Sequence, residues 1–267
     1  MSGCRLNERK DMAYITAWST DTGICKKTNQ DSALVMQAES FRGDVLMAAV
    51  CDGVGGLAKG ELASAYVAEQ LQNWFTDELE VLLEEEDMQM ALYHSWNRLI
   101  DQTNKEISGY AKKMGTHLGT TATVLLLVEN TYFIMNIGDS RIYILTDQMY
   151  QLTHDQTLVQ KEIDAGRLSL EDAMKDDRRS VLLQCIGASP TVIPDFFVGT
   201  IPSGSRYLLC SDGFRHEISP EEIYGKLSST GAQGYEQMKK GLNELIELNK
   251  SRQETDNITA VLIQAPL

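Results

Sequence analysis

The chain lacks any apolar run that approaches the ~20 residues a membrane helix needs. Its first residues, Met1-Ser2-Gly3-Cys4-Arg5, also lack the apolar core of a signal peptide. The cysteines, at positions 4, 25, 51, 185 and 210, show no paired spacing, so they indicate neither a disulfide framework nor a zinc site. We therefore expect a soluble protein of the cytoplasm.

Positive charge is scarce as well. The 24 Lys and Arg residues are outnumbered by 38 Asp and Glu residues, which gives a net charge of −14. Because nucleic acids and anionic membranes bind to basic surfaces, we expect neither as a partner. Much of the acid is local, as in Glu84-Glu85-Glu86-Asp87, which is typical of a solvated helix face.

Several phosphate-handling motifs are missing too. The glycine-rich stretch 55–60 lacks the Gly-Lys-Ser/Thr order of a phosphate-binding loop. No cysteine is followed six positions later by arginine, which excludes cysteine-phosphatase chemistry, and the absence of any Asp-x-Asp pair disfavours an aspartyl-phosphate mechanism. The histidines, at 94, 117, 154 and 216, show no metal-ligand spacing, so we interpret each as a surface or packing residue.

What the chain does contain is a set of short acid-bearing turns, each beside an apolar run. They are Asp52-Gly53, Gly138-Asp139-Ser140, Ser211-Asp212-Gly213 and Asp256-Asn257. Any one of them alone is better explained as an ordinary turn. A carboxylate at the tip of a buried strand is costly unless its charge is compensated. If the turns converge, their oxygens suit hard divalent cations such as magnesium or manganese.

Hydrophobic patterning predicts an α+β plan. Apolar runs predict strands at 33–38, 45–51, 121–128, 132–137, 141–145, 196–198, 207–210 and 258–263. Helical spacing predicts helices from 60 to about 75, from 92 to 110 with an end at Gly115, and from 235 to 248, with a polar helix-like stretch over 157–180 broken at Gly166.

Short turns between successive strands favour antiparallel pairing. Two antiparallel sheets packed together, with helices outside, would gather the acidic turns at one rim. A parallel doubly wound sheet is the weaker alternative. Without a linker or repeat, residues 1–267 are expected to form a single domain.

With these residues, the chain resembles the metal-dependent serine/threonine protein phosphatases of type 2C, in particular the bacterial ones. The resemblance covers residues from about 12 to 264. It is carried in order by Asn29-Gln30-Asp31-Ser32, Asp52-Gly53-Val54-Gly55-Gly56, Gly60-Glu61-Leu62-Ala63-Ser64, Gly119-Thr120-Thr121-Ala122, Ile137-Gly138-Asp139-Ser140-Arg141, Leu152-Thr153-His154-Asp155, Asp164-Ala165-Gly166, Ser211-Asp212-Gly213 and Asp256-Asn257-Ile258-Thr259.

The resemblance implies a four-layer αββα sandwich and a set of metal ligands. Asp52, Asp212 and Asp256 would hold a first ion. Asp52 and the carbonyl of Gly53 would hold a second, with Asp31 alongside, and Asp139 with Asp212 would form a third, weaker site. The implied catalytic residues are Asp31, Asp52, Asp212 and Asp256, and the implied cofactor is Mn²⁺ or Mg²⁺.

The implied reaction is hydrolysis of phosphoserine and phosphothreonine in proteins, without a phosphoenzyme. Two cations activate a water and neutralise the phosphoryl charge. Lys26 stands where the family has its phosphate-binding arginine, and Gln30 stands where it has an acid. Val54 replaces the histidine that many eukaryotic members use as general acid. The sequence therefore does not identify the group that protonates the leaving group.

Three alternatives concern how such a protein would act. The first is a general antagonist of serine/threonine kinases in signalling. The second is a phosphatase dedicated to one regulatory phosphoprotein. The third is a pseudophosphatase, which uses the same fold to bind a partner without hydrolysing phosphate. We expect a monomer. The segment at about 155–185 resembles the family's mobile flap, and we interpret it either as a solvated helix and loop or as a lid that docks peptides.

Overall fold

The computed structural model describes residues 14–54 and 59–266. Within them, ten strands form two five-stranded sheets in which every pairing of neighbouring strands is antiparallel. The first sheet has the order β1 (Ile15–Asp21), β10 (Ile258–Gln264), β9 (Arg206–Cys210), β6 (Arg141–Leu145) and β7 (Met149–Gln151). The second has the order β2 (Asp31–Ser40), β3 (Gly43–Asp52), β4 (Ala122–Val128), β5 (Thr131–Ile137) and β8 (Asp195–Thr200).

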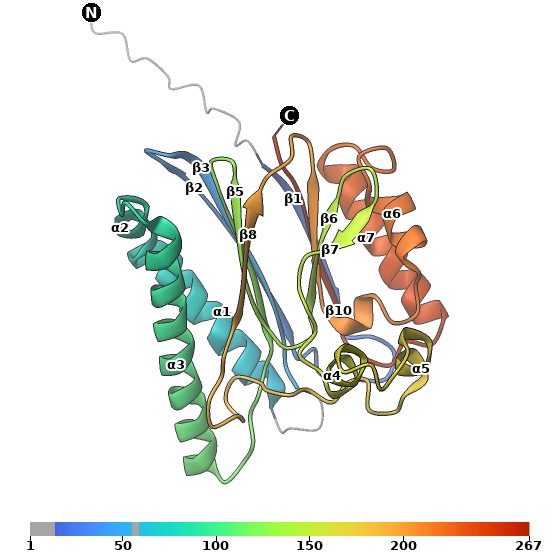
Figure 1. Cartoon of the computed structure of the whole chain (residues 1–267). Coiled ribbons are helices and arrows are strands. Elements are labelled where there is room, and N and C mark those ends of the chain that lie inside the picture. The colour runs from blue at the N-terminus through green and yellow to red at the C-terminus, as the bar shows by residue number, and fades with distance from the viewer. Residues whose placement is uncertain (1–13, 55–58, 267) are drawn as a thin grey trace, which may run out of the picture.

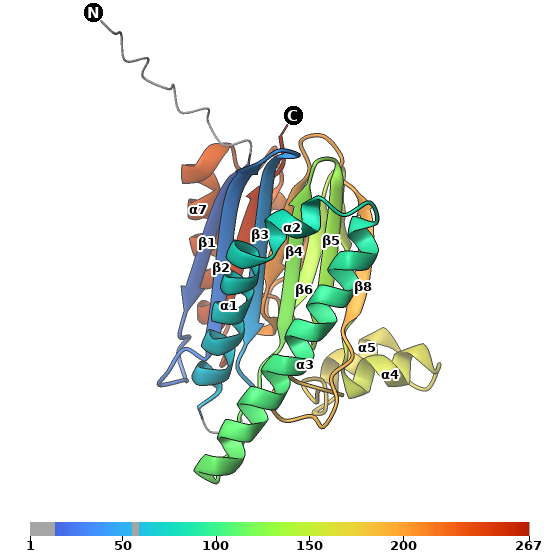
Figure 2. The ribbon, with the colours of Figure 1, turned by 90° about the vertical axis from the view of Figure 1, so that its left-hand side faces the viewer.

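The two sheets face each other, and helices cover both outer faces (Figure 1). On the β2–β8 sheet lie α1 (Gly60–Asp77), α2 (Leu79–Leu83) and α3 (Met88–Met114), as Figure 2 shows. On the other sheet lie α6 (Pro220–Leu227) and α7 (Gly234–Ser251). The predicted αββα sandwich is therefore confirmed, and the parallel alternative is wrong.

Strand alternation divides the apolar side chains between two kinds of core. In β3, Leu46 points into the layer between the sheets, whereas Met47 packs under the helices with Leu71 and Trp96. The layer between the sheets draws on both of them, for example Leu125 from β4 and Val261 from β10. The sandwich is held together by this shared layer.

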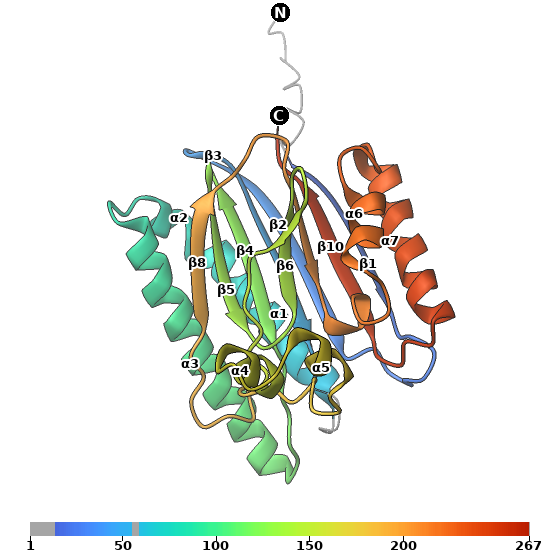
Figure 3. The same cartoon turned by 45° about the vertical axis from the view of Figure 1, so that its right-hand side comes forward.

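One short segment projects from the sandwich at the end where α1 begins (Figure 3). It carries α4 (Leu158–Asp164) and α5 (Leu170–Lys175), separated at Gly166, whose φ is +69°. Its two ends meet, because the Leu158 N–H donates to the Val181 carbonyl at 2.8 Å. We call residues 158–181 the flap.

Two strands and two α-helices were not predicted from the sequence: β1, β7, α2 and α6. Strand β1 pairs only with β10 and leaves Trp18 half exposed, so its hydrophobic pattern is weak. Helix α6 is short, but Ser219 and Glu222 form a capping box at its start, and Pro220 occupies the first turn. In the described ranges, every helix is either too short or too polar to span a bilayer.

Candidate metal centre

The turns at the end of β2 and β3 bring two carboxylates together. Asp31 opens β2 and lies directly opposite Asp52, the last residue of β3. The Gly53 N–H then donates to the Gln30 carbonyl at 3.1 Å. A Cβ on Gly53 would lie 2.6 Å from that oxygen, so only glycine allows this approach.

The backbone of Asp52 is fixed on its other side by the two threonines just before β4. Its N–H donates to Thr121 Oγ1 at 2.9 Å, and its carbonyl accepts from the Thr120 hydroxyl at 2.9 Å. Val54 follows with an N–H donated to the Gly119 carbonyl at 2.9 Å. The remainder of the glycine-rich signature, Gly55 and Gly56, lies outside the described residues.

The first sheet contributes Asp212 and Asp256 at the same end of the sandwich. Asp212 follows β9 and opens a single 3₁₀ turn, η1 (Asp212–Phe214), and Asp256 lies just before β10. Asn257 ties this region to the segment before β2, since its Oδ1 accepts from the Gln30 N–H at 2.9 Å. The Ser211 hydroxyl donates to Asp31 Oδ2 at 2.9 Å and so connects the two sheets at the site.

Asp139 comes from the turn between β5 and β6. Gly138 before it has a φ of +104°, and its N–H donates to Gln156 Oε1 at 3.0 Å. Arg215, three residues after Asp212, donates to the Asp139 carbonyl at 3.0 Å. The turn is therefore clamped between the base of the flap and η1.

These carboxylates lie near enough to one another for their charges to interact. Burial raises the pKa of Asp52 well above its usual range, and the charges of Asp31, Asp212, Asp139 and Asp256 raise it further. Burial raises the pKa of Asp31 to about 7, with hydrogen bonds from Ser211 and Thr259 opposing the shift. The pKa of Asp139 also rises to about 7, mainly because of burial and then because of the charge of Asp212. So many buried acids in mutual repulsion indicate that the site is built for positive charge.

The donor set fits hard divalent cations. The predicted ligands are all oxygens, and two of them, Asp31 Oδ1 and Asp212 Oδ1, are buried without a hydrogen-bond partner among the described residues. Within 14–54 and 59–266, no three His, Cys, Asp or Glu side chains form a ready-made cluster around one point, so the carboxylates share one end of the sandwich without a preformed cage.

Lys26 lies beside one of these carboxylates. Its ammonium is 2.9 Å from Asp256 Oδ1. Burial by itself would lower the pKa of Lys26, but the bond to Asp256 and the charges of Asp52 and Asp212 raise it. The Gln30 side chain donates from Nε2 to Glu61 Oε2 at 3.3 Å. Its contact with the site is through its backbone carbonyl, which accepts the Gly53 N–H.

Two residues at the site were missed by sequence reasoning. His216, interpreted as a surface or packing residue, lies between two acids: Nε2 is 3.5 Å from Asp212 Oδ2, and Nδ1 is 3.3 Å from Glu254 Oε2. Glu254, which no motif singled out, is 4% exposed. Their spacing of 38 positions leaves no local signal, so only the fold could bring them together.

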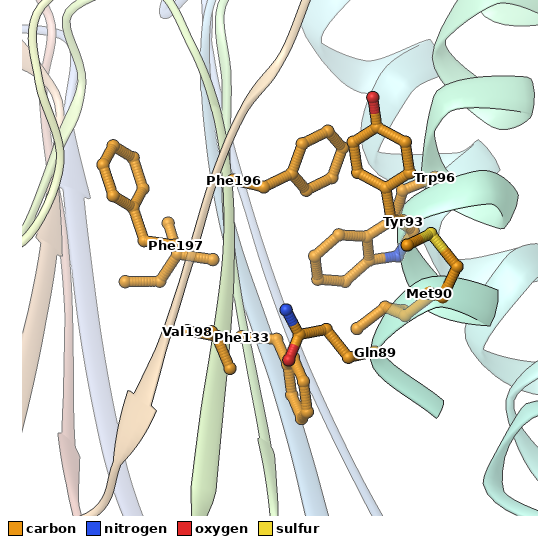
Figure 4. A pocket seen from close by; sticks show the side chains of 10 residues that line it. Gln89, Met90, Tyr93, Trp96, Phe133, Phe196, Phe197 and Val198 are labelled. Carbon is orange, nitrogen blue, oxygen red and sulfur yellow. The ribbon is translucent and has the colours of Figure 1, made fainter. Parts of the chain in front are cut away.

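A cleft of about 650 Å³ opens from Asp139 toward the flap. Asp139, Arg215 and His216 line it at the site end, Val159, Ile163, Met174 and Arg179 line it from the flap, and Ile218 and Ile223 line it from the opposite wall. A second pocket, of about 180 Å³, lies between α3 and β8 and is lined by aromatic side chains such as Tyr93, Trp96 and Phe196 (Figure 4). No ionisable carboxylate lines it, so we place the candidate site at the first.

Comparisons with known proteins point to one group. A family model described as protein phosphatase 2C matches residues 25–248. The serine/threonine phosphatase stp of Listeria innocua is 31% identical, over 93% of this chain and 94% of that protein. The crystal structure of the serine/threonine phosphatase PstP/Ppp of Mycobacterium tuberculosis superposes with a TM-score of 0.79 and 29% identity, covering 95% of this chain and 99% of that one. Another structure, of the PstP catalytic domain in complex with two manganese ions, has a TM-score of 0.76 with the same coverage of both chains.

Proposed function

This chain belongs to the protein phosphatase 2C family, and from that premise we propose that it hydrolyses phosphoserine and phosphothreonine in other proteins with the help of two Mn²⁺ or Mg²⁺ ions. The observation that carries the proposal is that Asp31, Asp52, Asp139, Asp212 and Asp256 lie at one end of the sandwich, where the other four charges add to burial in raising the pKa of Asp52. The manganese-containing relative supports the choice of metal.

The proposed ligand sets follow the positions of these carboxylates. Asp52, Asp212 and Asp256 would hold one ion, and Asp52 with the Gly53 carbonyl would hold the second, next to Asp31. Asp139 and Asp212 would hold a third, weaker ion. When bound, such ions supply a water of lowered pKa as nucleophile and neutralise charge on the phosphoryl group.

The protein's own residues orient this chemistry. The hydrogen bonds of Asp52 to Thr120 and Thr121 hold its carboxylate at the strand end. Lys26 would bind a phosphate oxygen, and its bond to Asp256 keeps the ammonium at the site until substrate arrives. A lysine binds phosphate as a point charge, without the two-pronged geometry of arginine. Val54 has no proton to donate, so another group must protonate the leaving hydroxyl.

The substrates we propose are phosphoproteins made by serine/threonine kinases. We further propose that residues 1–267 act as one catalytic domain and as a monomer in the cytoplasm. In the described ranges, Cys25, Cys51, Cys185 and Cys210 are all free thiols, which supports a reducing compartment.

The test is release of phosphate from a phosphothreonine peptide with and without Mn²⁺. We expect Asp52→Asn and Asp212→Asn each to lower the rate by at least about a hundredfold, because loss of a ligand should exceed the cost of losing a residue that merely supports one. Asp101→Asn, which removes an exposed acid paired with Lys105, is the matched control and should keep the wild-type rate.

Near-normal turnover in either ligand variant would refute the assignment. Mn²⁺ binding without any phosphate release from a panel of peptides would instead favour a binding module or a phosphatase dedicated to one protein.

A further inference from the structure

Asp212 and Asp256 lie on two segments that are far apart in the sequence. Asp212 lies in η1 after β9, and Asp256 lies in the turn before β10. Between them runs a chain of polar contacts through His216 and Glu254. Glu254 Oε1 accepts the N–H groups of Thr255 and Asp256, at 2.6 and 2.8 Å. Its other oxygen, Oε2, faces His216 Nδ1 at 3.3 Å, and His216 Nε2 faces Asp212.

We propose that His216 and Glu254 are positioning residues that hold the carboxylate of Asp212 and the turn of Asp256 at the spacing a shared metal ion requires. This inference rests on the proposed function, because it concerns ligands of the first proposed ion. It adds two residues of this chain that no family motif above includes.

Burial makes these contacts effective. The side chains of Asp212 and Glu254 are 9% and 5% exposed, and that of His216 is 14% exposed. Polar contacts shielded from water in this way are stronger than those at the surface.

The geometry of imidazole explains why a histidine stands here. Its two ring nitrogens face opposite directions, so an imidazole that carries a proton on both of them can donate to two carboxylates at once. A glutamine amide of similar size can donate to one of them but not to both. The 3.3 and 3.5 Å separations are longer than well-formed hydrogen bonds, and Glu254 Oε2 has no hydrogen-bond partner among the described residues, so these contacts are ion pairs rather than hydrogen bonds.

The backbone around His216 is held by other residues. Asn249, fully buried on α7, donates to the Phe214 carbonyl at 2.8 Å. Arg252 donates to the Glu217 carbonyl at 2.7 Å. Substitution of the imidazole therefore should not unfold this segment, and its effect should appear at the metal site.

The experiment is calorimetric titration of Mn²⁺ into the full chain and its variants, with thermal unfolding of each metal-free protein measured beside it. We expect His216→Gln to raise the Kd for Mn²⁺ by about 10–100-fold, the range typical of residues that support metal ligands. Phosphatase activity should then be lost at low Mn²⁺ and recovered at saturating Mn²⁺. His154→Gln is the matched control, since His154 also faces an acid, but that acid is Asp164 of the flap, at 2.8 Å, and not a proposed ligand.

Glu254→Gln provides a second, independent variant. Its amide oxygen can still accept the backbone N–H groups, but the charge opposite His216 is gone, so we expect a similar loss of Mn²⁺ affinity. The double variant should be little worse than the worse single one, because both substitutions break one chain of contacts. Additive losses would contradict this coupling.

Two negative results have different meanings. If the wild type binds Mn²⁺ and both single variants bind it with unchanged affinity, the positioning role is wrong and the proposed function stands. If neither the wild type nor the His154→Gln control binds Mn²⁺, both the proposed function and this inference fall. If His216→Gln does not fold, Glu254→Gln decides by the same criterion.

Discussion

Asp139 shows what burial does to a single acid of the site. It is 5% exposed and its pKa rises to about 7, through burial first and then the charge of Asp212. In the unfolded chain an aspartate titrates near pH ~3.9. Between these values the folded metal-free protein holds a proton that the unfolded chain has released, so the free energy of unfolding falls as the pH rises through this window.

We therefore expect the metal-free protein to lose stability between about pH 4 and pH 7 because of Asp139 and Asp31. Asp139→Asn removes one of these titrations, so it should raise the unfolding midpoint relative to wild type at pH 7.5 and bring no such gain at pH 4.5. Urea titrations at both pH values, with a chelator present, measure the difference. Asp101→Asn serves as the exposed control; an Asp139→Asn effect of equal size at both pH values would contradict the expectation.

Each proposed ligand lies at the tip of a strand, and the turns there leave no room for larger residues. A Cβ on Gly213 would lie 2.2 Å from the Asn257 carbonyl, and one on Gly138 would lie 2.5 Å from Thr121 Cγ2. The turns are packed against one another rather than simply exposed. This explains how short polar motifs far apart in the sequence form one rigid end of the sandwich.

The flap is a separate element with a narrow base. Its ends are joined by the hydrogen bond from Leu158 to Val181, so a linker of a few glycines can replace residues 158–181. The residues just outside it stay, because Gln156 binds the Gly138 N–H. Its apolar side chains, such as Ile163 and Met174, line the cleft that leads to Asp139.

We expect the flap replacement to lower kcat/KM for a phosphothreonine peptide by about tenfold or more, as a lost apolar contact surface would. Hydrolysis of a small phosphate ester should stay near the wild-type rate, because the proposed ligands are untouched. Both rates are measured on the same preparation at saturating Mn²⁺. Equal losses on the two substrates would argue against peptide docking and for a solvated surface segment.

At the scale of the molecule, the metal centre depends on both sheets. Asp31 and Asp52 come from the β2–β8 sheet, and Asp212 and Asp256 come from the other. The apolar layer between the sheets sets their separation, and the bond from Ser211 to Asp31 crosses it at the site. Partial separation of the sheets would therefore dismantle the site.

We expect the chain to unfold in one cooperative step, as a single domain does. In a Trp18→Phe variant, the remaining tryptophans, Trp74 and Trp96, both lie in the helix layer on the β2–β8 sheet, with ring centroids 5.6 Å apart. Their fluorescence reports that layer, whereas far-ultraviolet circular dichroism reports both halves. The two signals should give the same urea midpoint, and separate midpoints would indicate two units.

Hydrophobic pattern identified most of the elements of this fold. The run 45–51 matches β3 (Gly43–Asp52), and Gly115 ends α3 as predicted, with a φ of +61°. The edge strand β1 was not predicted because it buries few side chains, and α6 was not predicted because it is short. The acidic turns were identified at the residue level, since strand ends and turn dipeptides are local signals.

The sequence by itself determined the α+β class, the acidic turns and the resemblance to type 2C phosphatases, because periodicity and short motifs depend only on neighbouring residues. Tertiary structure alone decided which acids share a charge environment, that Lys26 is paired with Asp256, and that His216 and Glu254 stand between two proposed ligands. Those relations join residues tens to hundreds of positions apart. They arise only when packing of the two sheets brings distant strand ends to one rim, where burial and like charge make each carboxylate depend on the others.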